Sequence, residues 1–266
     1  MRFSRAGELT RWALDAGNLL LFLDYDGTLV DFAPTPDRLD PDPKVVGLLG
    51  QLAKKPNTIT TVISGRRLPD LRILLPVPGL YLGGTYGLEL FTPSGETIYR
   101  ADYADVRPVL ESIKSRWELI LSARSGFFLE DKGWTLALHA RFAAPAEAAQ
   151  ALASARQAID PAELAVRFHI LGGHRFLEIA PLAASKRETV LYLLGQFALP
   201  GARCMYIGDD DKDEEAFPAI HAQGGAAIKV AQPSQSSSLT AADYLFESPR
   251  QTIHWLESLV GSNPPA

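Results

Sequence analysis

One stretch of this chain reads Leu19-Leu20-Leu21-Phe22-Leu23-Asp24-Tyr25-Asp26-Gly27-Thr28-Leu29. It begins with a continuous apolar run, which is typical of a strand buried on both faces in a parallel sheet. Two carboxylates follow, Asp24 and Asp26, and Gly27 then allows a sharp backbone turn. Because ligands in open α/β sheets bind at the carboxyl ends of the strands, this stretch predicts a polar site at one edge of such a sheet.

The two carboxylates suit the hydrolysis of a phosphate ester. Asp24 can act as the nucleophile, since carboxylates form aspartyl-phosphate intermediates. Asp26 can give a proton to the leaving alkoxide and later remove one from water. At roughly 3.5 Å and an effective dielectric of about 20, the attacking carboxylate and a phosphate charge repel each other by about 5 kcal/mol. Other residues must therefore bring positive charge to this site.

Hairpin turns and calcium loops can also contain an Asp-x-Asp-Gly pattern, but both fit this chain less well. Asp-Gly pairs form hairpin turns, whereas here Thr28-Leu29-Val30 leads into a segment with Pro34 and Pro36 instead of a return strand. Calcium loops open with Asp-x-Asp, but they follow a helix and place glycine at the sixth position. In this chain the glycine is fourth and a strand precedes, so phosphate chemistry is favoured.

A second acidic run follows the apolar residues Tyr206 and Ile207 and reads Gly208-Asp209-Asp210-Asp211-Lys212-Asp213-Glu214-Glu215. Taken alone, it could equally well be an acidic helix start. Together with Asp24 it predicts a magnesium site, because Mg²⁺ prefers a few carboxylates completed by phosphate and water. We expect Asp209 to be the direct ligand from this run, with Asp210 and Asp213 close by or behind it.

Two weaker sequence signals supply the hydrogen-bond donors and the positive charge that this site needs. Ser64-Gly65-Arg66 follows a β-branched run, Thr58–Ile63, that predicts the next parallel strand. Lys186 opens a helical pattern, although an isolated lysine more often occupies a solvated surface position. In combination, Ser64 provides hydroxyl and N–H donors and Lys186 provides a fixed positive charge for the phosphate.

Composition limits the classes of protein that remain. The chain has 266 residues, 47% of them hydrophobic, and a formal net charge of −5 without a basic stripe, which argues against nucleic-acid binding. Its single cysteine, Cys204, lies in an apolar run and is expected to be a buried strand thiol. The apolar run Leu19–Leu23 is too short for a membrane span or a signal peptide, so we expect a cytoplasmic protein with no membrane partner.

The order of the elements predicts two domains. Strand and helix patterns alternate at both ends of the chain, with a third strand expected at Gly79–Leu82. The middle has helices and two hairpin-like units, Phe127–Glu130 with Thr135–Arg141 and Leu164–His169 with Arg175–Ile179. We predict a doubly wound parallel-sheet α/β core, residues 1–104 and 182–266, interrupted by an α+β domain at 105–181.

In this order, Asp24 with Asp26, Ser64, Lys186, and Asp209 with Asp210 resemble the four motifs of the haloacid dehalogenase (HAD) superfamily. The resemblance implies a Rossmann-like core with an inserted α/β cap, Mg²⁺ as cofactor, and a phosphoaspartate at Asp24. It also implies that the metal is held by the Asp24 carboxylate, the Asp26 carbonyl and Asp209.

In finer detail the chain resembles the trehalose-6-phosphate phosphatases. The matching pieces are Leu23–Leu29, Ile63–Arg66, Leu129-Glu130-Asp131-Lys132-Gly133, His139-Ala140-Arg141, Leu177-Glu178-Ile179 and Gly208-Asp209-Asp210. The resemblance implies hydrolysis of trehalose 6-phosphate, with Glu130, Lys132 and Glu178 of the cap holding the sugar. Carboxylates accept hydrogen bonds from sugar hydroxyls and an ammonium group donates them. Gly65 and Arg66 are expected to contact the substrate as well.

The chain departs from this family's pattern at three positions. Tyr86 stands where His is usual, Arg187 follows Lys186 where Gly is common, and Lys212 replaces a usual Thr. None of them is the nucleophile or the acid, so the expected reaction class is unchanged. Three alternatives stay open, namely a glycosyl-3-phosphoglycerate phosphatase, a sugar phosphomutase and a non-catalytic sugar-phosphate sensor. We expect a monomer or a weak homo-oligomer.

Overall fold

The computed structural model describes residues 3–31, 39–173, 175–197, 199–232 and 240–261. The expected proline segment at 34–36 lies outside these ranges. The chain forms two compact units. We call them the core unit, Met1–Ile98 with Ser185–Ala266, and the insert unit, Tyr99–Ala184. No helix within the described ranges is both long and apolar enough to cross a membrane.

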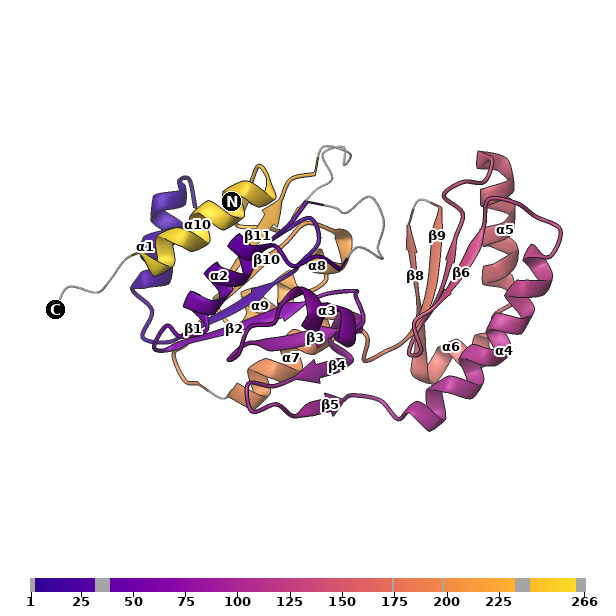
Figure 1. Cartoon of the computed structure of the whole chain (residues 1–266), viewed down its shortest axis with the longest axis horizontal. Coiled ribbons are helices and arrows are strands. Elements are labelled where there is room, and N and C mark those ends of the chain that lie inside the picture. Colours follow the sequence, from indigo (N-terminus) through magenta and orange to yellow (C-terminus); the bar gives the residue numbers. More distant parts are fainter. Residues whose placement is uncertain (1–2, 32–38, 174, 198, 233–239, 262–266) are drawn as a thin grey trace. The chain divides into compact units, whose positions relative to one another are not determined.

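An eight-stranded sheet forms the centre of the core unit, in the order β12-β11-β10-β1-β2-β3-β4-β5 (Figure 1). All neighbouring strands from β12 to β3 run parallel, and β4 is antiparallel to β3. The strands are β1 (Leu19–Leu23), β2 (Thr58–Ile63), β3 (Tyr81–Gly84), β4 (Glu89–Phe91), β5 (Thr97–Tyr99), β10 (Arg203–Gly208), β11 (Ala226–Val230) and β12 (Tyr244–Phe246).

These strands were predictable because β1 is apolar on both faces and β2 is rich in β-branched residues. Leu19–Leu23 and Thr58–Ile63 form β1 and β2 with the predicted bounds, and Cys204 is a buried free thiol in β10. The prediction for the third strand was wrong by two residues. Gly79 has a φ of +89°, so it belongs to the turn before β3, which starts at Tyr81.

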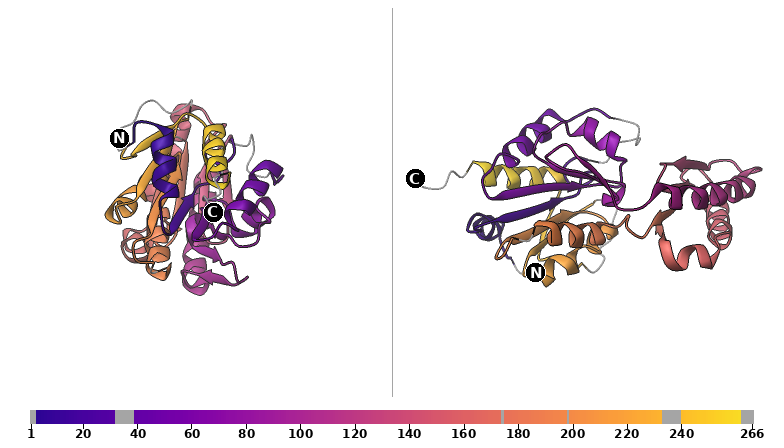
Figure 2. Two further views of the ribbon diagram at one scale, coloured as in Figure 1. Left: turned by 90° about the vertical axis from the view of Figure 1, so that its left-hand side faces the viewer. Right: turned by 90° about the horizontal axis from the view of Figure 1, so that it is seen from below.

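Helices cover both faces of this sheet, as a doubly wound fold requires (Figure 2). Alternate residues of β1 point to opposite faces. Leu21 packs in one hydrophobic cluster with residues of α1, α2, α3 and α10, and Phe22 packs in another with residues of α7 and α9. These helices are α1 (Ala6–Leu14), α2 (Pro43–Leu52), α3 (Leu68–Leu74), α7 (Lys186–Phe197), α9 (Phe217–Ala222) and α10 (Pro249–Val260).

The insert unit has a four-stranded antiparallel sheet in the order β6-β7-β9-β8, with α4 and α5 along one face (Figure 1). Trp117 ties these two helices together, since its indole N–H donates to the Ala155 carbonyl at 2.9 Å. The strands are β6 (Phe128–Asp131), β7 (Leu136–His139), β8 (Phe168–Gly173) and β9 (Phe176–Pro181), and the helices are α4 (Tyr103–Leu121), α5 (Pro145–Gln157) and α6 (Pro161–Arg167).

The helix α6 corrects a prediction. Leu164–Arg167 was expected to belong to a strand, but these residues are helical and β8 begins only at Phe168. Asp160 accepts a hydrogen bond from the Ala162 N–H at 2.8 Å through its side chain, and Pro161 is the first residue of the helix. An acidic cap followed by proline is a strong helix start, and it outweighs the strand-like pattern of the residues that follow.

Candidate active site

The two acidic motifs meet because their strands are neighbours. β1 pairs with β10 in parallel, with Leu23 opposite Ile207, and the Asp24 N–H donates to the Ile207 carbonyl at 2.9 Å. Asp24 and Asp209 therefore emerge side by side at the carboxyl edge of the sheet. Both are almost fully buried, at 4% and 1% exposure.

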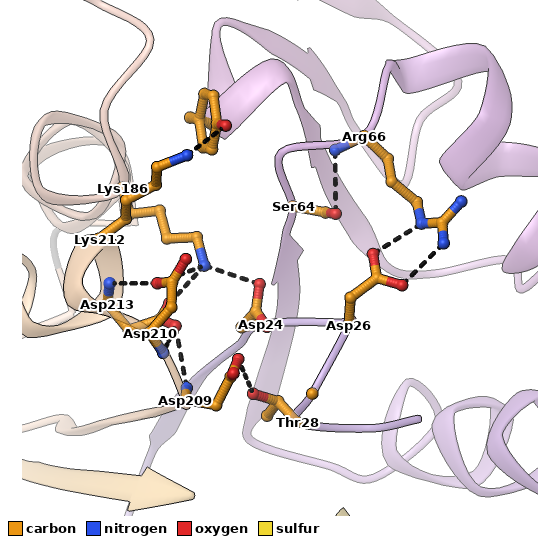
Figure 3. Close-up of polar contacts among 12 residues, drawn as sticks. Asp24, Asp26, Thr28, Ser64, Arg66, Lys186, Asp209, Asp210, Lys212 and Asp213 are labelled. Carbon is orange, nitrogen blue, oxygen red and sulfur yellow. Dashed lines mark hydrogen bonds and ion pairs between the residues drawn. The ribbon is translucent and has the colours of Figure 1, made fainter. Parts of the chain in front are cut away.

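Lys186 brings the positive charge to these carboxylates. It is the first residue of α7 and is 3% exposed. Its Nζ donates to Asp24 Oδ1 at 2.7 Å and to Asp213 Oδ1 at 2.5 Å, and Asp210 Oδ1 lies 3.7 Å away (Figure 3). Burial alone favours the neutral amine, but the three carboxylates outweigh it and hold the pKa of Lys186 well above its ordinary value.

A short helix, α8 (Asp211–Glu214), shapes the second acidic motif. Asp210 caps it, because its side chain accepts from the Asp213 N–H at 3.0 Å. Asp213 in turn accepts from the N–H groups of Asp209 and Asp210, at 2.9 and 3.0 Å, and from the Tyr206 hydroxyl at 2.7 Å. The carboxylate of Asp213 thus organises the loop that presents Asp209.

Asp24, Asp209 and Asp213 form an acidic triad in which one carboxylate oxygen of each residue lies within 4.8 Å of the other two. One oxygen of the triad, Asp209 Oδ2, is buried and has no hydrogen-bond partner among the described residues. Burial, reinforced by the charges of Asp213 and Asp210, raises the pKa of Asp209 to about 7. Burial also raises the pKa of Asp24 to about 8, although Lys186 acts in the opposite direction. Crowded hard-oxygen ligands with an unsatisfied atom fit a divalent cation. Both Asp213 oxygens already accept hydrogen bonds, so Asp24 and Asp209 are the members of the triad that can hold a metal.

The remaining predicted ligands have different surroundings. The Asp210 side chain is the cap of α8 and lies outside the triad. The Asp26 carboxylate is held by Arg66 in a bidentate pair, at 2.6 Å from Nε and 2.7 Å from Nη2 (Figure 3). Because Arg66 occupies both carboxylate oxygens, the atom of Asp26 that remains as a candidate metal ligand is its backbone carbonyl oxygen. The resemblance to the HAD superfamily implies the same atom.

Ser64, Gly27 and Gly65 pack closely against other residues of the site. Ser64 is buried and its Oγ accepts from the Arg66 N–H at 3.1 Å. Gly27 has a φ of +81°, and a Cβ there would lie 2.5 Å from Asp209 Oδ2. A Cβ at Gly65 would lie 2.8 Å from the Tyr86 ring. Neither position has room for a Cβ atom, so both require glycine.

Two of the three departures from the family pattern contact each other, which the sequence alone did not reveal. Lys212 Nζ lies 4.3 Å from the centre of the Tyr86 ring and donates to the Tyr86 hydroxyl at 2.5 Å. Tyr86 adopts a left-handed conformation in the 3₁₀ turn η1 (Thr85–Gly87). Its N–H donates to the Ser64 carbonyl and its carbonyl accepts from Thr189 of α7, both at 2.8 Å. Tyr86 therefore connects the segments that carry Ser64, Lys186 and the acidic loop.

The predicted sugar-binding residues lie together in the insert unit. Lys132 Nζ donates to Glu178 Oε1 at 3.2 Å and lies 3.9 Å from Glu130 Oε2. Glu178 is fully buried and also accepts from the Thr135 hydroxyl at 2.6 Å. Although burial acts in the opposite direction, His139 and Lys132 lower the pKa of Glu130. The three residues form one charged cluster.

Solved structures share this fold. The C-terminal domain of a trehalose-6-phosphate phosphatase from Candida albicans has the same fold, with a TM-score of 0.82, 20% sequence identity and 97% of each chain covered. A parallel sheet with an acidic triad at its carboxyl edge, interrupted by an α+β insert, is the HAD-type phosphatase fold.

Sequence comparison defines the family. The family model described as trehalose-phosphatase matches residues 22–250. A probable trehalose-phosphate phosphatase of Sinorhizobium fredii is 32% identical over 231 residues, which cover 86% of this chain and 84% of that protein. A trehalose-phosphate phosphatase of Mycobacterium avium is 30% identical over 245 residues, which cover 90% of this chain but only 61% of that protein. The chain belongs to the trehalose-phosphatase family, whose members are phosphoric monoester hydrolases.

Proposed function

We propose that this chain hydrolyses trehalose 6-phosphate to trehalose and phosphate through an aspartyl-phosphate on Asp24. The observation that carries the proposal is the buried contact of Asp24 with Lys186, at 2.7 Å, beside Asp209 and Asp213. A structural ion pair alone would not need the further buried carboxylates. The family assignment supports trehalose 6-phosphate as the substrate.

In the first step an oxygen of Asp24 attacks the phosphorus and the phosphorus–oxygen bond to the sugar breaks. Before this step Asp26 must take up a proton, and one of its oxygens must leave Arg66. Asp26 gives that proton to the leaving sugar oxygen and becomes a carboxylate. Lys186 offsets the repulsion of about 5 kcal/mol between the attacking carboxylate and a phosphate charge. Its ammonium group is already hydrogen-bonded in place, so little reorganisation is needed during the reaction.

In the second step a water molecule attacks the phosphorus of the aspartyl-phosphate. Asp26 takes a proton from this water, the Asp24–phosphorus bond breaks, and inorganic phosphate leaves. Arg66 orients the Asp26 carboxylate for this role through its two hydrogen bonds. Ser64, buried next to Arg66, would donate to a phosphate oxygen.

We propose Mg²⁺ as the cofactor, held by the carboxylates of Asp24 and Asp209 and the carbonyl of Asp26, with Asp213 and Asp210 supporting the loop. When bound, it neutralises negative charge on the phosphate and on Asp24. The protein residues orient the nucleophile, the acid and Lys186 around that position. A cytoplasmic location and a monomeric or weakly associating state stay predictions.

We further propose that the domain at 105–181 selects the sugar, with Glu130, Lys132 and Glu178 binding its hydroxyls. The support is chemical, since two carboxylates and one ammonium group offer both acceptors and donors within one cluster. Contacts of this kind, remote from the reacting phosphate, can contribute binding energy to catalysis.

The test measures phosphate release from a panel of sugar phosphates with Mg²⁺ and after chelation. We expect release from trehalose 6-phosphate that needs Mg²⁺ and is abolished by Asp24→Asn. Asp15→Asn is the control, because Asp15 is an exposed carboxylate of the core unit. Full activity of a folded Asp24→Asn variant would end the phosphoaspartate proposal. Cleavage of a glycosyl 3-phosphoglycerate instead, isomerisation without release, or binding without turnover would favour one of the three alternatives.

A further inference from the structure

The sheet of the insert unit presents two neighbouring rows of side chains on one face. Directly opposite residues of paired strands share a face, and residues two apart along a strand do so too. The pairings β6–β7 and β7–β9 define a polar row of Glu130, Ala137 and Glu178, and an aromatic row of Phe128, His139 and Phe176. The opposite face carries buried leucines such as Leu138 and Leu177.

Close ring contacts hold the aromatic row together. The rings of Phe128 and His139 stack at a centroid distance of 4.3 Å and an angle of 6°, and Phe176 packs against His139 at 5.2 Å and 55°. His139 also joins the two rows, because its Nε2 lies 2.9 Å from Glu130 Oε2. Phe128 is nevertheless 44% exposed, so part of its ring surface faces outward beside the charged cluster.

The combination of these rows matches the two kinds of surface on a sugar ring. Its hydroxyls need acceptors and donors, which Glu130, Lys132 and Glu178 offer. Its C–H groups form an apolar face with slightly positive hydrogens, which suits the negative face of an aromatic ring. Phe142 of the same unit is more exposed, at 78%, but it lies outside both rows and so serves as a comparison.

We propose that the aromatic row is a stacking subsite for a sugar ring of the substrate, with Phe128 as its contact surface. The subsite extends the proposed function, on which it rests, by adding an apolar contact to the polar row. His139 is a positioning residue in this subsite, since it supports the Phe128 ring on one side and hydrogen-bonds Glu130 on the other.

The experiment compares Phe128→Ala with the matched control Phe142→Ala. Steady-state kinetics are measured on the sugar phosphate that the wild-type chain cleaves best, beginning with trehalose 6-phosphate, and on acetyl phosphate, which has no ring. Inhibition by free trehalose, or by the sugar of that substrate, reports on sugar binding without phosphate. We expect Phe128→Ala to raise the KM for the sugar phosphate and the inhibition constant of the sugar about 3- to 10-fold, the range of an aromatic stacking contact.

Acetyl phosphate kinetics should stay unchanged in Phe128→Ala, and Phe128→Tyr, which keeps the ring, should restore wild-type constants. Unchanged sugar constants in Phe128→Ala, or an equal loss on acetyl phosphate, would overturn the stacking subsite. A wild-type chain that cleaves a different sugar phosphate would overturn only the substrate named above. A chain that cleaves none would overturn the proposed function and this subsite together.

Discussion

Replacing Asp209 by Asn should remove a large part of the pH dependence of the stability of the metal-free protein. Asp209 is 1% exposed, and burial with the charges of Asp213 and Asp210 raises its pKa from 3.8 to about 7. Between these values the folded protein holds a proton that the unfolded chain releases. The free energy of unfolding must therefore fall as pH rises through this range.

The magnitude follows from the shift. About three pKa units at 1.36 kcal/mol each give an upper limit of about 4 kcal/mol. The triad carboxylates titrate together, so we expect about 2–4 kcal/mol for Asp209 itself. The amide in the Asp209→Asn variant has no proton to lose. Without metal, this variant should therefore gain about 2–4 kcal/mol over the wild type as the pH rises from about 4 to 7.

Urea denaturation across this pH range, with a chelator and then with Mg²⁺, measures both parts of the prediction. Mg²⁺ should stabilise the wild type increasingly as pH rises, because it binds the deprotonated carboxylate, and should stabilise the variant much less. Asp211→Asn is the control, since Asp211 is an exposed carboxylate of the same acidic motif, at the start of α8. A difference between wild type and Asp209→Asn that does not change with pH, or equal stabilisation of both by Mg²⁺, would refute the reasoning.

Three further predictions concern other parts of the molecule. Gly27→Ala should lower kcat at least about 100-fold in steady-state assays, because its Cβ would displace the Asp209 carboxylate, whereas Gly7→Ala, with open space at its Cβ, should not. Tyr86→Phe and Lys212→Met should show non-additive losses of unfolding free energy, coupled by about 0.5–3 kcal/mol in urea titrations; strict additivity would contradict a direct contact. Alanine at Glu130, Lys132 or Glu178 should lower kcat/KM for trehalose 6-phosphate about 10- to 150-fold and affect p-nitrophenyl phosphate far less; equal losses on both esters would exclude a role in sugar selection.

The parts of the fold that the sequence predicted are those in which local pattern and burial agree. The strand Leu19–Leu23 is apolar at every position and lies between two helix layers, so its pattern had one interpretation. The prediction for Leu164–Arg167 was wrong because a helix start at Asp160 and Pro161 competes with the strand-like pattern after it. Short helices such as α8 depend on caps that only the folded loop completes.

For the candidate site, the residue types were predictable and the contacts were not. Lys186 was assigned a fixed positive charge, and the structure gives it two carboxylate partners from separate elements. Tyr86 and Lys212 were noted only as separate departures from the family pattern. Their contact joins residues 126 positions apart, and it follows from the approach of η1 to α8 after folding. No local pattern carries that information.

The way in which the chain enters and leaves the insert unit has a practical consequence. Arg100 near its start donates to the Ala183 carbonyl near its end, at 3.1 Å, so both ends of Tyr99–Ala184 lie close together. A segment whose two ends are adjacent can be inserted into another protein at a single site, because the host chain does not have to span a gap. The insert is thus suited to exchange as one piece between related phosphatases, and the sugar selection proposed for it should move with a single contiguous piece of the gene.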